Sequence, residues 1–465
     1  MENMTLQNIV RACGGIYQGT ETDRNREITG VALDCRKVEK GFCYIAIQGM
    51  PCGGDAFISE ALKKEAVCVI CEAIPEGAAG NFVVVGDSLQ ALEELAVFYR
   101  SMLHIPVIGI TGSVGKTELK EFIAGVLGQR YNVWKTEGNW NNEAGVAMTL
   151  LGIRSAHEIA VVEMGVSRFG EMRCMSKMAA PDTAIITNIG SCHLDFLRSR
   201  EGVLQAQSEL FDYLQGDGVV YMNGDDDMLR NIERVRHKRP ATYGLNGKND
   251  YYADNIVNHG LAGSSAAIHT PYGSFPAEIP LPGEPMIRHA LAAAAIGMQY
   301  GLTVEEIRKG IAGLTLSGSS SNIIRKGTLT VIDSCEQASP LSVKAALDTL
   351  ASSGGLTVAI LGDMSGLGGP GSDERKLHKD IGRYAVRKKI TGLICVGRLA
   401  RFMYQGGCKE KEKTLHNTFV HYYETQEAMQ AMLEDLRRLP QEVTVLVKAS
   451  RNMGFSTVVE ALIKS

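Results

Sequence analysis

The fold is decided by the stretch Gly109-Ile-Thr-Gly-Ser-Val-Gly-Lys-Thr117. The apolar run 106–111 enters this glycine-rich turn, and a helical pattern with apolar residues three and four positions apart follows it, from Leu119 to Leu127. Backbone N–H groups of such a turn, together with the positive potential of a helix N-terminus, hold a polyphosphate. The pattern predicts a phosphate loop built from Gly112, Ser113, Val114, Gly115, Lys116 and Thr117.

The last two residues of this loop have expected chemical tasks. Lys116 is expected to reach the outer phosphates of a nucleotide, and the Thr117 hydroxyl is expected to ligate Mg²⁺. The longer form of the motif requires a glycine where this chain has Ile110, so only the shorter form is present. A glycine-rich strand–helix turn without a ligand remains the alternative.

Two polar residues follow neighbouring strand-like runs after the loop. Glu163 closes the apolar run 159–163, and His193 follows the apolar run 183–188. In a parallel sheet both would lie at the same edge as the phosphate loop. Because Mg²⁺ prefers carboxylate oxygens and phosphates, Glu163 is a candidate metal ligand near Thr117. Alone, a glutamate at a strand end is usually a solvated edge residue and a loop histidine is usually structural, so Glu163 and His193 gain weight only from their shared edge.

Length and composition are those of an ordinary globular protein. The 465 residues suggest about three domains. Hydrophobic residues make up 45% and charged residues 22%, and the net charge is −4. This charge argues against a nucleic-acid binder that depends on a positive field over a whole domain. It leaves room for a local basic pocket.

The expected cellular location rests on two sequence features, a secretory signal and a membrane-spanning segment, neither of which is seen. No basic start followed by an apolar run marks a secretory signal, and the most apolar stretch, 290–298, is too short to span a bilayer. We therefore expect a cytoplasmic protein with no membrane contact. The pair Cys68 and Cys71 lies inside a strand-like run without a second pair or nearby histidines, so buried thiols are favoured over a zinc or redox site.

Strands and helices alternate along the chain, which predicts an α/β fold with three domains. The first segment, 1–104, is expected to be a small α/β domain. The second, 105–315, is expected to be a phosphate-loop domain with a mostly parallel sheet. The third, 316–465, resembles a smaller doubly wound, Rossmann-like domain, in which ligands lie at the carboxyl ends of the strands.

Taken together, these segments resemble the Mur ligase family along nearly the whole chain. The residues that carry the resemblance include the segment 28–36, the phosphate loop 111–117 and the asparagine-rich segment 138–145. Glu163-Met-Gly165 and the segment 188–193 resemble the segments of the family that hold magnesium. Leu361-Gly-Asp-Met364, His378 and Leu446-Val-Lys-Ala-Ser-Arg451 resemble its third domain.

The resemblance implies an ATP-dependent amide ligase, most similar to the branch that adds D-alanyl-D-alanine to a peptidoglycan precursor. ATP would phosphorylate a carboxylate of a UDP-linked muramyl peptide, and a dipeptide or amino-acid amine would attack the acyl phosphate. Lys116, Glu163 and His193 are the implied catalytic residues, in a monomer that needs Mg²⁺. The resemblance also implies that Thr117 and Glu163 hold one magnesium and that His193 helps to hold a second. Among the implied substrate-binding residues, Asp34 and Arg36 would meet the uridine nucleotide, Ser450 and Arg451 would line the amine side, and Asn142 completes the set.

Several positions depart from the family pattern. Gln207 stands where the family has a lysine that becomes a carbamate and holds a second magnesium, and an amide nitrogen cannot take up CO₂. Ser319 replaces an arginine, Met286 an asparagine and Gly366 an acid. Two other hypotheses therefore stay open beside the ligase: a degenerate paralogue that binds nucleotide or a partner without turnover, and a different phosphate-loop enzyme.

Overall fold

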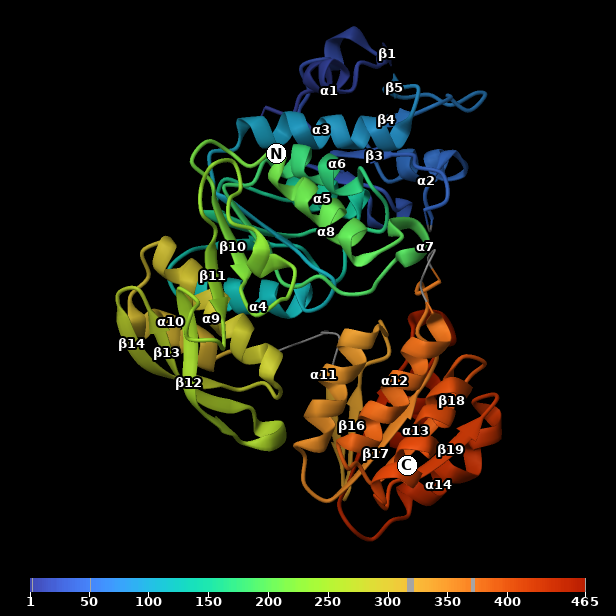
Figure 1. Cartoon of the computed structure of the whole chain (residues 1–465). Helices are drawn as coiled ribbons and strands as arrows, with labels where there is room; N and C mark the ends of the chain where they lie inside the picture. Colours follow the sequence, from blue (N-terminus) through green and yellow to red (C-terminus); the bar gives the residue numbers. More distant parts are fainter. Residues whose placement is uncertain (2, 51, 316–321, 369–372, 465) are drawn as a thin grey trace.

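Three β-sheets, each with its own helices, follow one another along the chain (Figure 1). The structure is a computed structural model that describes all residues of the chain except 2, 51, 316–321, 369–372 and 465. The predicted α/β class is confirmed. Each expected segment contains one sheet; the boundary between the second and third segments adjoins residues outside the description and stays a prediction.

The first sheet has five strands in the order β1-β5-β4-β3-β2, all parallel except β1. Its strands are β1 (Ile16–Gln18), β2 (Gly30–Ala32), β3 (Phe42–Ile45), β4 (Cys68–Cys71) and β5 (Phe82–Val84). Its helices are α1 (Leu6–Cys13), α2 (Ile58–Lys63) and α3 (Ser88–Met102). Cys68 and Cys71 are buried free thiols, as expected, and burial raises the pKa of Cys71 to about 11.

The central sheet has nine strands in the order β14-β13-β12-β11-β10-β9-β6-β8-β7. They are β6 (Val107–Thr111), β7 (Val133–Lys135), β8 (Ile159–Glu163), β9 (Thr183–Ile186), β10 (Val219–Asn223), β11 (Ala241–Gly244), β12 (Tyr251–Asn258), β13 (Ser264–Thr270) and β14 (Gly273–Ile279). Strands β12 to β14 are antiparallel, an extension that the sequence analysis did not predict. The alternation of buried Phe275, Ala277 and Ile279 with exposed residues is the signal that indicates it.

Helices cover both faces of the central sheet. One face packs against α4 (Lys116–Leu127), α9 (Glu284–Gln299) and α10 (Val304–Ala312). The other packs against α3, α5 (Glu143–Leu151), α6 (Glu171–Ala179) and α8 (Arg200–Ser208), with the short α7 (Leu194–Leu197) beside them. Helix α9 is buried along most of its length, which explains its alanine-rich run. Among the described residues, no helix has the length and apolarity needed to span a membrane.

The third sheet has six strands in the order β15-β16-β20-β17-β18-β19. They are β15 (Asn322–Lys326), β16 (Leu329–Asp333), β17 (Leu356–Leu361), β18 (Gly392–Val396), β19 (Phe419–Tyr423) and β20 (Val443–Lys448). Helices α11 (Pro340–Ala351), α12 (Glu374–Arg387) and α13 (Ala400–Thr414) cover one face. Helices α14 (Gln430–Arg437) and α15 (Ser456–Ile463) cover the other.

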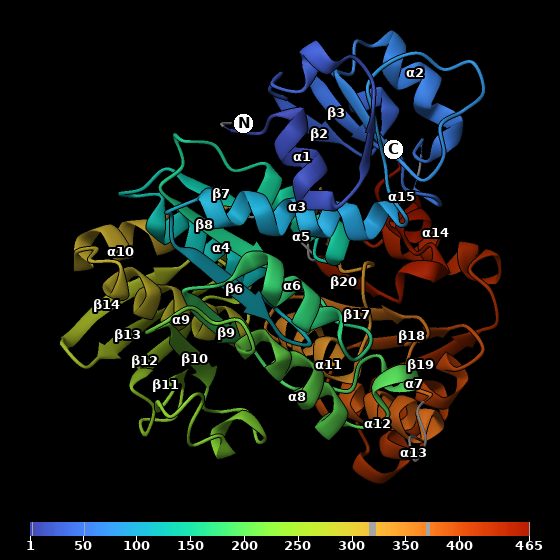
Figure 2. The same ribbon diagram turned by 90° about the horizontal axis from the view of Figure 1, so that it is seen from above.

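The three parts are joined by shared elements and by one cavity. Helix α3 lies between the first sheet and helices α5 and α6, so the first two parts share a core (Figure 2). A cavity of about 570 Å³ opens where the carboxyl ends of β6 and β8 face the carboxyl ends of β16 and β20. This is the edge at which parallel sheets bind ligands.

Candidate active site

The predicted phosphate loop lies between the end of β6 and the start of α4. Gly112 and Gly115 have φ angles of +145° and +84°, which side chains rarely adopt. A Cβ at Gly112 would overlap the Thr187 hydroxyl, and one at Gly115 would lie 2.7 Å from the His289 ring. The loop is therefore packed between β9 and α9, and only glycine fits at both positions.

Not every N–H group of the loop faces a ligand. The N–H groups of Ser113 and Val114 donate to the backbone and side-chain oxygens of Asn188, both at 3.0 Å. The N–H groups that open α4, from Gly115 onward, have no intrahelical acceptor. These N–H groups lie at the positive end of the helix dipole and can bind an anion. Lys116 lies beside them, with its ammonium 2.9 Å from the Gly112 carbonyl oxygen.

We predict that Gly112→Ala lowers both stability and nucleotide affinity. Positive φ and steric overlap each cost roughly 1–3 kcal/mol, so the free energy of unfolding should fall by about 2–4 kcal/mol. Thermal unfolding and ADP calorimetry measure the two effects. Gly49→Ala is the matched control, since Gly49 has φ +82° but open space around its Cβ position. An equal loss in both variants would contradict the packing argument.

Glu163 is the buried centre of a polar cluster at the end of β8. Its Oε1 accepts hydrogen bonds from the Thr117 hydroxyl at 3.1 Å and from the Asn141 amide at 2.8 Å. Its Oε2 lies 3.4 Å from the ammonium of Lys120, which also donates to the Gly138 carbonyl oxygen at 2.9 Å. The structure thus brings Thr117 and Glu163 together, as predicted.

Two members of this cluster were missed from the sequence. Lys120 follows Lys116 by one helical turn, a spacing that places both on one side of α4. Asn141 precedes Asn142, which the sequence analysis selected. Asn142 lines the cavity, but its side chain caps α5 by accepting from the Gly145 N–H at 2.9 Å. The neighbouring asparagine is the one that reaches Glu163.

His193 and Gln207 lie on the other side of the phosphate loop. Both line the cavity. Burial and the nearby Lys116 charge lower the pKa of His193, which keeps the ring neutral at neutral pH and able to ligate a metal. Gln207 is 1% exposed; its amide donates to the Ser113 hydroxyl oxygen at 3.2 Å, and its Oε1 has no hydrogen-bond partner among the described residues.

The donor set can be tested against magnesium from these contacts. Thr117 and Glu163 offer hard oxygens 3.1 Å apart, and Glu163 Oε2 accepts no hydrogen bond from the described residues, so this pair fits the ion. His193 with Gln207 offers one imidazole and one neutral oxygen. That second set lacks a negative charge, which predicts weak binding of a second Mg²⁺.

Helix α9 and the third sheet complete the cavity wall. Met286 and His289 face the cavity from α9. Both ring nitrogens of His289 lack a hydrogen-bond partner among the described residues, and burial lowers the pKa of His289 to about 3. From the third sheet come Ile332, Ser334, Glu336, Gln337 and Lys448.

Comparison with known proteins places this geometry in a family. The model of the Mur ligase middle domain matches residues 110–297. A UDP-N-acetylmuramoyl-tripeptide–D-alanyl-D-alanine ligase of Bacillus subtilis (strain 168) is 35% identical over 470 residues, covering 100% of this chain and 99% of that protein. The chain belongs to the Mur ligase family. The same-named ligase of Escherichia coli (strain K12) is 30% identical, with 99% of each chain covered.

Solved structures of Mur ligases agree over the whole chain. MurF from Acinetobacter baumannii has a TM-score of 0.88 and 28% identity, with 99% of each chain covered. MurF from Thermotoga maritima, solved in complex with ADP, has a TM-score of 0.80 and 25% identity, covering 93% of this chain and 96% of that one. The expected class, an ATP-dependent ligase, is confirmed, and these relatives support it over a paralogue without turnover.

In this Mur ligase the expected uridine-side pair, Asp34 and Arg36, lies in the first part of the chain and outside the cavity wall. The two side chains bind each other, with 2.7 Å between Arg36 Nη2 and Asp34 Oδ2. The Arg36 guanidinium lowers the pKa of Asp34 to about 2. Lys37 lies over the Trp140 ring at 5.2 Å, which places this pair beside the asparagine-rich segment.

The expected amine-side pair, Ser450 and Arg451, also lies outside the cavity wall of this Mur ligase. The Ser450 hydroxyl accepts from the Ser365 N–H at 2.8 Å, and Arg451 is exposed. His378 is structural, because its ring bonds the Met364 N–H and the Glu374 carbonyl oxygen. Within the described wall the basic residue from the third sheet is Lys448.

The remaining family departures have different structural settings. Gly366 has φ +74°, and its carbonyl oxygen accepts from the Leu194 N–H at 3.0 Å, which joins the third part of the chain to the His193 segment. A residue with a side chain would be strained at this φ angle, so the backbone conformation favours glycine over the acid that the family has at this position. Ser319 lies outside the described residues.

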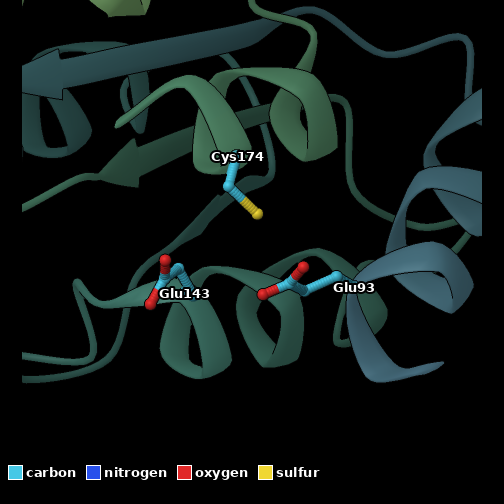
Figure 3. Close-up of side chains that lie close together, drawn as sticks. All are labelled: Glu93, Glu143 and Cys174. Atoms are coloured by element: carbon cyan, nitrogen blue, oxygen red, sulfur yellow. The ribbon is translucent and has the colours of Figure 1, made fainter. Parts of the chain in front are cut away.

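A group of metal-ligand residue types lies between α3, α5 and α6 (Figure 3). Candidate ligand atoms of Glu93, Glu143 and Cys174 lie within 4.8 Å of one another. Burial raises the pKa of both carboxyl groups and raises that of Cys174 to about 12. These shifts favour protonated side chains. The hydrogen bond between Cys174 and Glu93 raises the pKa of the thiol and partly opposes the rise at the carboxyl group. We interpret the group as a polar contact between helices.

Proposed function

We propose that this chain joins D-alanyl-D-alanine to a UDP-N-acetylmuramoyl-tripeptide, using ATP and Mg²⁺. The observation that carries the proposal is the buried contact between Thr117 and Glu163 at the phosphate loop, in a chain that matches ligases of that name along its full length. The cytoplasm, where such nucleotide-linked precursors meet ATP, is the proposed location. A monomer remains our prediction.

In the proposed reaction the tripeptide carboxylate attacks the γ-phosphorus of ATP, and ADP leaves. The amine of the dipeptide then attacks the acyl carbon, loses a proton and displaces phosphate. Such chemistry depends on positioning and on charge stabilisation. Bound Mg²⁺ would offset charge on the transferring phosphoryl group.

Each proposed catalytic residue has a defined task. Lys116 neutralises phosphate charge from the loop. Thr117 and Glu163 hold the metal, and Asn141 orients Glu163 by donating to its Oε1. His193, neutral and facing the cavity, contributes an imidazole nitrogen as a metal ligand. The loop N–H groups from Gly115 onward bind the phosphates.

Phosphate release measures this function directly. Purified protein is incubated with ATP, Mg²⁺, the UDP-linked tripeptide and D-alanyl-D-alanine, and each substrate is omitted in turn. Release that requires the amine supports the ligase. ATP binding without release supports the paralogue without turnover. Release with neither substrate present supports a different phosphate-loop enzyme.

We predict that Gln207→Lys strengthens the second metal site when bicarbonate is present. A lysine amine can form a carbamate, which adds the negative oxygen that Gln207 lacks, so the affinity for the second metal should rise by about tenfold. Mn²⁺ titration with ADP, with and without bicarbonate, measures it. Gln207→Met is the matched control, and its Mn²⁺ affinity should be the same with and without bicarbonate. Identical titrations of wild type and Gln207→Lys would show that residue 207 lies outside the metal shell.

A further inference from the structure

Lys448 is a buried ammonium in the wall of the cavity. It ends β20, the strand between β16 and β17, and is 4% exposed. Its Nζ donates to the Ser334 hydroxyl oxygen at 2.9 Å and to the Gln337 carbonyl oxygen at 2.7 Å. The third contact, to the Ser334 carbonyl oxygen, is long at 3.4 Å, which leaves one N–H group weakly used.

No carboxylate of the described residues lies within ion-pair distance of the Lys448 ammonium. All three acceptors are neutral oxygens. Burial lowers the pKa of Lys448 to about 8, although Glu118, Asp333, Cys335 and Glu336 act in the opposite direction. A buried ammonium without an ionic partner is costly, so such a residue in a cavity indicates a ligand that brings negative charge.

The topology places this ammonium where a ligand binds. Helices α11 and α12, which follow β16 and β17, cover one face of the third sheet, and α15, which follows β20, covers the other. Neighbouring strands that lead to opposite faces leave a crevice at their carboxyl ends. Lys448 lines this crevice, and Glu118 from the first turn of α4 lines the same cavity, so Lys448 and the start of the phosphate-loop helix border one space.

We infer that Lys448 binds an anionic oxygen group of a ligand held between the phosphate loop and the third sheet. The inference rests on the proposed function and adds a third-domain residue to it. Two sources offer this chemistry: a phosphate of the nucleotide and the terminal carboxylate of the dipeptide. Its position in the same cavity as the first turn of α4 favours the phosphate.

Nucleotide binding to the full chain distinguishes these sources. Lys448→Met should weaken ADP binding about tenfold to a hundredfold, since it removes a charged hydrogen bond. Adenosine binding should change by less than about threefold, because adenosine lacks phosphate. An unchanged ADP affinity with a raised KM for D-alanyl-D-alanine assigns the carboxylate instead. If neither quantity changes, the inference is wrong.

A second measurement needs no variant that could misfold. An anion beside Lys448 raises its pKa from about 8, so wild-type protein at pH 8 should take up protons when ADP binds. Calorimetry in two buffers of different ionisation enthalpy detects the uptake. Lys448→Arg should bind ADP without it, because arginine stays charged. The raised pKa of the neighbouring Cys335 keeps that thiol protonated at pH 8, so it cannot supply the uptake.

These outcomes also separate the inference from the proposed function. Wild-type protein that binds no ADP would refute both. Wild-type protein that binds ADP without proton uptake, with equal ADP affinity and dipeptide KM in Lys448→Met, would refute only the role of Lys448. Circular dichroism of each variant shows whether the third sheet is intact.

Discussion

Lys116→Met is expected to lower kcat/KM for ATP by about 10²- to 10³-fold, equivalent to roughly 2.7–4 kcal/mol of transition-state stabilisation. The side chain keeps its length and loses its charge. In the free protein its ammonium contacts only the Gly112 carbonyl oxygen among described partners, at 2.9 Å, so little structural stability depends on it. Steady-state phosphate release at saturating amine and tripeptide measures the effect.

The matched control for this variant is Lys309→Met, which removes an exposed lysine from α10 of the same part of the chain. The control should keep wild-type kinetics. Lys116→Met should keep the wild-type melting temperature within about 2 °C, because its lost contact is a single partly exposed hydrogen bond. If Lys116→Met turned over at the wild-type rate, the proposed role of the phosphate loop in the reaction would be wrong.

Glu163→Gln is expected to lower both activity and stability. The variant removes the anionic metal ligand, so kcat/KM should fall about 10²- to 10³-fold and the Mg²⁺ needed for half-maximal rate should rise. It also removes the nearer carboxylate from Lys120, which is 1% exposed, and leaves this lysine only Glu121 at 3.7 Å. Breaking a buried ion pair on one side costs about 3–5 kcal/mol. Metal-dependent kinetics and denaturant unfolding measure the two losses.

A double variant separates the two roles of Glu163. Combining Glu163→Gln with Lys120→Met removes both buried charges, so most of the stability should return. Activity should stay low, since the metal ligand is still absent. If activity recovers together with stability, then Glu163 acts by packing alone, and the proposed metal site at Thr117 loses its main support.

Local patterns predicted the elements that carry the site. The helical pattern from Leu119 to Leu127 lies within α4 (Lys116–Leu127), and the apolar run 159–163 is β8 (Ile159–Glu163). The rule that parallel strands end at a common edge placed Glu163 and His193 beside the phosphate loop. The antiparallel strands β12 to β14 were not predicted. Their buried and exposed residues alternate one by one, a pattern that differs from the strand–helix alternation of the rest of the segment.

Local sequence patterns could not predict the direction in which each side chain points. Asn141 and Asn142 are adjacent and chemically identical, yet one orients Glu163 and the other caps α5. The choice depends on where α5 begins relative to β8. Asp34 and Arg36 form an ion pair with each other, which no local pattern indicated, and their role in binding the uridine nucleotide stays a prediction.

The sequence by itself determined the α/β class, the phosphate loop and the carboxylate at the end of β8, because these depend on short-range periodicity and on a local motif. The family followed from the resemblance of several motifs along the chain. Only the tertiary structure decided that Lys120 pairs with Glu163, that His289 packs against Gly115 and that Lys448 lines the same cavity as the phosphate-loop helix. These three residues act through contacts between elements far apart in the chain. Burial, which gives such charges their effect, exists only once the sheets have packed.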